Sequence, residues 1–77
     1  MSTETGDLTL DQYRSIEWHT NEMIVACLSA ISKLRQIPEP QRGPQIVNQL
    51  TYYKNAIGGF KWSLGLARQR CPAARNA

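Results

Sequence analysis

Apolar residues in the first half of the chain recur every three or four positions, the spacing that aligns side chains along one side of an α-helix. The stripe, which includes one threonine, consists of Tyr13, Ile16, Thr20, Met23, Ile24, Cys27, Ala30, Ile31 and Leu34. Thr9 and Gln12 have the spacing of a capping box, in which each side chain accepts a hydrogen bond from the other residue's backbone N–H. Pro38 disfavours helical backbone at Ile37. We therefore predict a helix over residues 10–36.

A second apolar stripe follows, and its steps alternate between four and three residues, as in a heptad repeat. It consists of Ile46, Leu50, Tyr53, Ile57, Phe60, Leu64, Ala67 and Cys71. Pro44 suits the first position of a helix because its missing N–H would have no helical partner there in any case. We predict a helix over residues 44–70 and a turn over residues 37–43, where two prolines and a glycine interrupt the helical pattern.

The two stripes match when the second helix runs back along the first. With a turn at residues 37–43, residues whose numbers sum to about 80 lie at the same height, and the apolar positions face each other along both helices. We predict an all-α helical hairpin that dimerises into a four-helix bundle. The hairpin occupies residues 9–71, after a disordered segment at 1–8 and before a frayed tail at 72–77.

Three glycines disagree with the pattern of the second helix. Gly58, Gly59 and Gly65 lie inside it, and each destabilises a helix by about 1 kcal/mol relative to alanine. One interpretation is that they allow close packing against a neighbouring backbone, or are simply tolerated. The alternative is a kink that splits the helix near Gly58.

Composition limits the chain to one small domain of 77 residues, 42% of them hydrophobic. The longest uncharged stretches, 23–32 and 43–53, are shorter than the ~20 apolar residues that a membrane-spanning helix needs. Residues 1–7 have neither the basic start nor the apolar core of an export signal. We therefore expect a cytoplasmic protein that does not enter membranes, with Cys27 and Cys71 as reduced thiols.

The residues that could support catalysis or metal binding do not form a recognisable site. His19 and Glu22 are three residues apart on one side of a helix, but the facing positions near Phe60 and Lys61 offer no further metal ligands. Cys27 lies eight residues from His19, about 12 Å along the helix, which is too far for a nucleophile–base pair. We expect no catalytic, cofactor or metal site, and no enzymatic activity.

Charge is distributed unevenly between the two halves. Residues 1–39 hold six acidic and three basic side chains, whereas residues 40–77 hold six basic and no acidic ones. Lys54, Lys61 and Arg68 are seven residues apart and form a basic ridge that could contact the phosphates of a nucleic acid. The other interpretation is structural: in an antiparallel hairpin the acidic start of the first helix lies beside the basic end of the second.

Large apolar residues outside the two stripes suggest a binding surface. They include Trp18, Val25, Leu28, Trp62 and Leu66, which a two-helix hairpin cannot bury. We interpret them as an interface with a partner protein or with a second copy, although scattered exposed apolar residues are also normal.

Three functional hypotheses follow. The first is a small regulatory module, an inhibitor for example, that sequesters or modulates a partner protein, such as a transcription factor or an enzyme, and acts as a homodimer. The second is a nucleic-acid-associated protein that uses the basic ridge. The third is a subunit that serves only in assembly.

Overall fold

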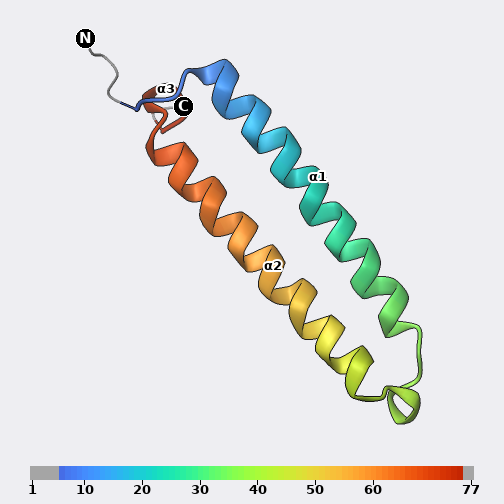
Figure 1. Cartoon of the computed structure of the whole chain (residues 1–77). Helices are drawn as coiled ribbons and strands as arrows, with labels where there is room; N and C mark the ends of the chain where they lie inside the picture. Colours follow the sequence, from blue (N-terminus) through green and yellow to red (C-terminus); the bar gives the residue numbers. More distant parts are fainter. Residues whose placement is uncertain (1–5, 76–77) are drawn as a thin grey trace.

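The computed structural model of the chain describes residues 6–75, and its two long helices run antiparallel, side by side (Figure 1). In this part of the chain the elements are α1 (Leu10–Arg35), the 3-10 helix η1 (Glu39–Gln41), α2 (Pro44–Gln69) and α3 (Pro72–Arg75). The prediction of an all-helical hairpin is confirmed. The bounds of α1 and α2 differ by one residue from the predicted ranges 10–36 and 44–70.

The first turn of α1 is closed by the capping box expected from the sequence. The backbone N–H of Gln12 donates to Thr9 Oγ1 at 3.1 Å, and the N–H of Thr9 donates to Gln12 Oε1 at 2.9 Å. Asp11 lies in the same turn, where the helix dipole favours a negative charge. These contacts fix where the helix begins.

The turn between the helices is held by Arg42, whose role the sequence pattern did not reveal. Its Nε donates to the carbonyl of Ile37 at 2.8 Å, and its Nη2 donates to the carbonyl of Arg35 at 3.0 Å. The last carbonyls of a helix have no partner within the helix. Arg42 therefore stabilises both the end of α1 and the path of the chain into α2.

The seam between the helices is narrower than the apolar stripe of α1. Tyr13, Thr20, Cys27 and Ile31 are the residues of α1 that are buried. Ile16 and Met23, which the stripe placed in the seam, are 37% and 43% exposed. This expectation was wrong for them because a single facing helix covers only one side of α1. Ile16 and Met23 directly precede Glu17 and Ile24, which are half-buried, and they therefore lie at the edge of the contact between the helices.

Helix α2 continues through Gly58 and Gly59, so it is not split there. A Cβ atom added at Gly58, Gly59 or Gly65 would meet nothing within 4 Å. Packing within the chain therefore does not require glycine at any of the three positions. None of the residues of α2 is fully buried, which leaves the second helix with a large accessible surface.

The C-terminal end is more ordered than the predicted frayed tail. Residues 72–75 form α3, in which Ala74 is buried, and the preceding Cys71 is fully buried. These two small side chains pack with Tyr13, and Leu8, Leu10, Leu64 and Ala67 surround them. Pro72 does not end the ordered chain, because proline is well suited to the first position of a new helix.

The prediction that residues 1–8 are disordered also needs correction, for residues 6–8. The N–H of Leu8 donates to the carbonyl of Arg70 at 2.7 Å. Nε and Nη2 of Arg70 donate to the carbonyl of Gly6 at 3.0 and 2.7 Å. Backbone and side chain of Arg70 thus hold residues 6–8 against the end of α2. Residues 1–5 and 76–77 lie outside the described residues.

Candidate interaction surfaces

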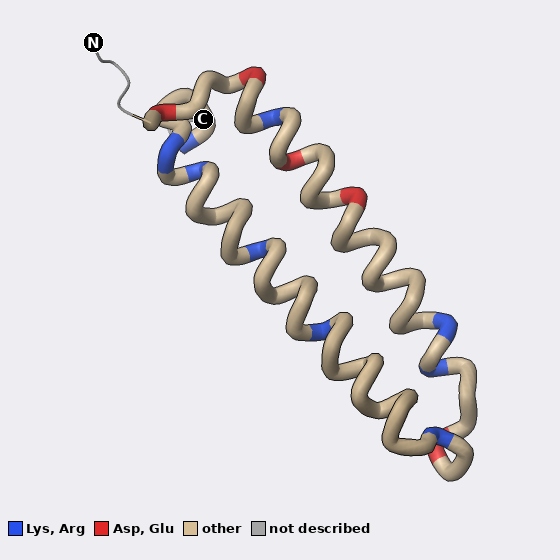
Figure 2. The backbone as a smooth tube through the Cα atoms, viewed as in Figure 1, with Lys and Arg blue, Asp and Glu red and all other residues tan. Residues whose placement is uncertain are grey.

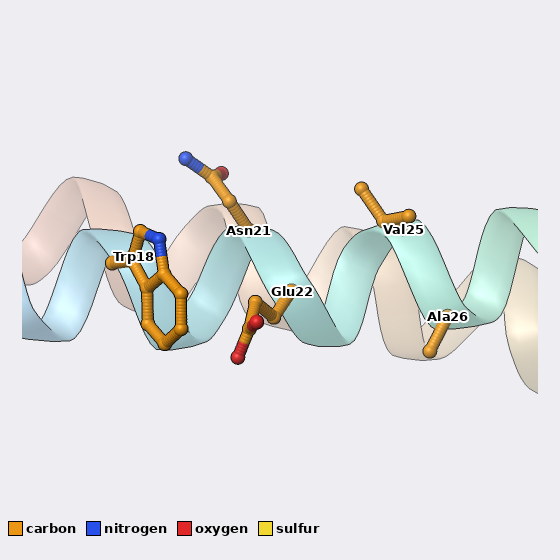
Figure 3. Close-up of a pocket in the computed structure, with 5 residues that line it drawn as sticks. All are labelled: Trp18, Asn21, Glu22, Val25 and Ala26. Atoms are coloured by element: carbon orange, nitrogen blue, oxygen red, sulfur yellow. The ribbon is translucent and has the colours of Figure 1, made fainter.

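One exposed apolar surface follows the outer side of α1. Trp18, Val25 and Leu28, called here the outer stripe, are exposed, and Trp18 retains 60% of its accessible surface. Trp18 and Val25 line a shallow hollow with Asn21, Glu22 and Ala26, all from α1 (Figure 3). No other element contributes a wall, so the hollow is open and the outer side of α1 projects from the hairpin. Its shape suits insertion into a groove of another protein.

The ring of Trp18 has a defined neighbour. It lies edge-on to the imidazole of His19, with ring centroids 5.2 Å apart and planes at 77°. This arrangement is favourable for aromatic pairs. Trp18 and His19 thus form an aromatic pair at the N-terminal end of the outer stripe.

A second exposed surface surrounds Trp62 on α2. Trp62 is two residues from Phe60 and from Leu64, about 200° around the helix from the seam, and it is 69% exposed. Gly58, Gly59 and Gly65 lie four and three residues before it and three residues after it. Since these three neighbours carry no side chains, the backbone beside the indole is uncovered there, and Leu66, four residues after Trp62, is its neighbour with a large side chain. We call Trp62 and the three glycines the Trp62 surface.

The structure does not merge the five predicted interface residues into one patch. Trp18 and Trp62 lie at similar heights, but the hollow beside Trp18 is lined by α1 alone. Leu66 is four residues after Trp62 and is therefore its neighbour on α2, and it also lines a hollow with Ile16 and Ser63 between the two helices. The exposed apolar residues of α1 and those around Trp62 therefore form separate surfaces.

The basic ridge of Lys54, Lys61 and Arg68 is exposed along α2 (Figure 2). Arg68 shares a hollow with Arg14 and Glu17 of α1, which widens the basic surface and also places one carboxylate beside it. Burial raises the pKa of the Tyr13 phenol, the charge of Glu17 raises it further, and Arg68 opposes both. The Tyr13 side chain is also hydrogen-bonded to Glu17. Glu17 is thus held near the ridge.

Groups suited to chemistry are dispersed over the described residues. Among them, no three His, Cys, Asp or Glu side chains come close enough to hold a metal ion. Cys27 and Cys71 are both free and buried. No helix in the described part of the chain has an apolar run long enough to cross a bilayer.

A further surface was missed by the sequence reasoning, which assigned Ile16 and Met23 to the seam. Ile16 shares a hollow with Ser63 and Leu66, and Met23, seven residues later, lies on the same side of α1. Residues of α2 recur along this side at steps of three and four. We call this surface the uncharged face, formed by Ile16, Met23 and Ala30 of α1 and by Tyr52, Ala56, Gly59, Ser63 and Leu66 of α2. In the sequence, this face is visible as a second series of uncharged residues in α2, which recurs at steps of three and four residues beside the series that forms the seam.

Comparison of the chain with protein-family models, with curated proteins and with solved structures found no match. What these surfaces bind is therefore inferred from their own chemistry.

Proposed function

We propose that this chain is a small regulatory module without catalytic activity, which sequesters or modulates a partner protein, such as a transcription factor or an enzyme. The outer stripe and the Trp62 surface make the contacts. The proposed working form is a homodimer in which two hairpins form a four-helix bundle. The observation that carries the proposal is the 60% and 69% exposure of Trp18 and Trp62.

The three glycines of α2 support this proposal energetically. Together they destabilise the helix by about 3 kcal/mol relative to alanine. A domain of this size has a total stability of roughly 4–12 kcal/mol. A Cβ at any of them would lie in open space, so the fold gains nothing from glycine there. Around Trp62, bare backbone would let a partner approach the indole closely.

The outer stripe indicates the chemistry of the partner. Trp18, Val25 and Leu28 follow one another at seven and three residues on a single helix. This is the anchor pattern of a helix that lies in an apolar groove. Tryptophan is enriched among the residues that contribute most to such interfaces. The proposed partner therefore presents a hydrophobic groove rather than a charged surface.

Replacing Trp18 or Trp62 by alanine should weaken partner binding by roughly 30-fold or more, because truncation of a central interface residue costs about 2 kcal/mol or more. Proteins captured by the wild type are compared by quantitative mass spectrometry with those captured by each variant. Binding of the recovered protein is then measured with purified components. Circular dichroism should show unchanged helicity.

Val47→Ala is the matched control, since Val47 is an exposed apolar residue of α2 outside both surfaces. It should bind like the wild type. Equal binding by Trp18→Ala, Trp62→Ala and the wild type would contradict the proposed role of these surfaces.

A second candidate function is binding to nucleic acid, favoured by the three evenly spaced cations of the basic ridge and by Arg14 beside Arg68. If it operates, Lys61→Ala lowers the slope of log affinity against log salt by about 1 for a labelled duplex, because one phosphate contact is lost. Lys33→Ala removes the same charge away from the ridge and should leave the slope unchanged. Fluorescence anisotropy at several salt concentrations measures both. No measurable binding at low salt would exclude this function.

A further inference from the structure

The uncharged face is continuous along the middle of the hairpin. Ile16, Met23 and Ala30 are seven residues apart, so they lie on one side of α1, two turns from one to the next. The hollow that holds Ile16, Ser63 and Leu66 shows that this side of α1 and the second stripe of α2 belong to one surface. None of its residues is charged, and Arg70 lies at one end of it, in the hollow with Ile16 and Leu66.

The chain exposes more surface than a compact protein of its mass. Its accessible surface is 5686 Å², roughly 1,000 Å² above the ~4,700 Å² typical of a compact monomer of this size. Its radius of gyration is 17.0 Å, compared with about 11–12 Å for a compact domain of this length. A stable interface buries about 800 Å² on each partner. The excess is therefore enough to supply one such interface.

We propose that the uncharged face is the surface on which a second copy of this chain docks, with both hairpins pointing in the same direction. This inference deepens the proposed homodimer and does not depend on capture of a partner protein. The two-fold axis then runs parallel to the helices, and α1 of each copy lies over α2 of the other at the same height.

Side-chain sizes are complementary in this arrangement. Within a hairpin, residues whose numbers sum to about 80 share a height, as Tyr13 and Ala67 do in the buried cluster. Met23 of one copy therefore lies over Ala56 and Gly59 of the other. Ala30 lies over Tyr52 in the same way, so a large side chain meets a small one at both levels. Gly59 has open space where a Cβ would be, so nothing within its own chain blocks Met23 of the second copy.

Charge also favours the same direction for the two hairpins. Helix α2 contains basic and no acidic residues, whereas the first half of α1 contains Asp11, Glu17 and Glu22 (Figure 2). Docking in the same direction places the basic half of α2 over this acidic half of α1. Docking in opposite directions would instead stack the two basic helices α2 on each other, with the basic ridge of each copy on the far side of its hairpin. Salt screens these interactions within about 10 Å, so they select the orientation more than they drive the association.

The test compares two neighbouring substitutions by equilibrium sedimentation. The wild type should be a dimer. Gly59→Arg should raise the dimer dissociation constant by roughly 100-fold or more, because the interface would bury an arginine without a partner. Gly58→Arg makes the same exchange one residue away, outside the uncharged face, and should dimerise like the wild type. A monomeric wild type, or equal dimerisation of both variants, would overturn the proposal. A monomeric Met23→Arg variant, which leaves the outer stripe and the Trp62 surface intact, should still capture the partner protein, and this separates loss of dimerisation from a failure of the proposed function.

Cysteine cross-linking tests the direction. After mild oxidation of an equimolar mixture of Met23→Cys and Gly59→Cys, peptide mass mapping should find a disulfide between positions 23 and 59 of different chains. Gly59→Cys alone should not cross-link, because the two α2 helices lie diagonally across the bundle. Mapping also separates these products from any involving Cys27 and Cys71, which are buried. A disulfide between two copies of position 59 would show that the hairpins point in opposite directions.

Discussion

Replacing Ile31 by alanine should lower the free energy of unfolding by about 2–4 kcal/mol, the range for deleting a large aliphatic side chain from a packed position. Ile31 is 6% exposed and is one of the few large apolar side chains that the hairpin buries. Alanine is the better helix former, which offsets a few tenths of a kcal/mol at most. Urea denaturation followed by circular dichroism, at one fixed protein concentration, measures the change.

Val25→Ala provides the comparison on the same helix. Val25 is 63% exposed, so its truncation loses little burial and gains helix propensity. The variant should be as stable as the wild type or slightly more stable. If Ile31→Ala were equally harmless, the described seam would not be the contact that holds the hairpin together.

Replacing Gly58 and Gly65 together by alanine should raise the free energy of unfolding by about 2 kcal/mol. The reason is that both positions are helical and that a Cβ at either meets no atom within 4 Å. The double variant should nevertheless bind the partner less tightly if partner backbone approaches Trp62 across these positions. Denaturation and binding, measured on the same samples, would then show a higher free energy of unfolding together with weaker partner binding.

Thr51→Ala is a suitable control, since it is an exposed substitution on the same helix away from Trp62. It should leave partner binding unchanged. A double glycine variant that is more stable and binds as tightly as the wild type would mean that the glycines do not serve recognition.

The features that the sequence predicted well depend on local signals. The capping box of Thr9 and Gln12, the prolines of the turn and the heptad spacing of α2 act within a few residues, so α1, α2 and the turn could be located. The errors concern contacts between distant residues. Cys71 and Ala74 are ordered because they pack against Tyr13, some 60 residues earlier, and no local pattern indicates this.

The choice of the seam on α1 failed for a different reason. Ile16 directly precedes Glu17, which lies nearer the seam, and hydrophobicity alone favours Ile16 for that position. Met23 directly precedes the half-buried Ile24 in the same way. Glu17 is nevertheless half-buried, because its hydrogen bond with Tyr13 makes that position tolerable for a carboxylate. The exposed Ile16 then becomes part of the uncharged face. Recognition of that face required the direction of each side chain and not only its spacing.

The contacts at the two ends of the hairpin have a consequence for its alignment. A heptad seam repeats itself, so one helix could slide along the other by seven residues and still place apolar side chains opposite each other. Arg42 binds the carbonyls of Ile37 and Arg35 at the turn, and at the other end Leu8 and Arg70 join the start of the chain to the end of α2. A slipped pairing would break both sets of hydrogen bonds. The polar contacts at the ends therefore select one register from several that the apolar seam alone would accept.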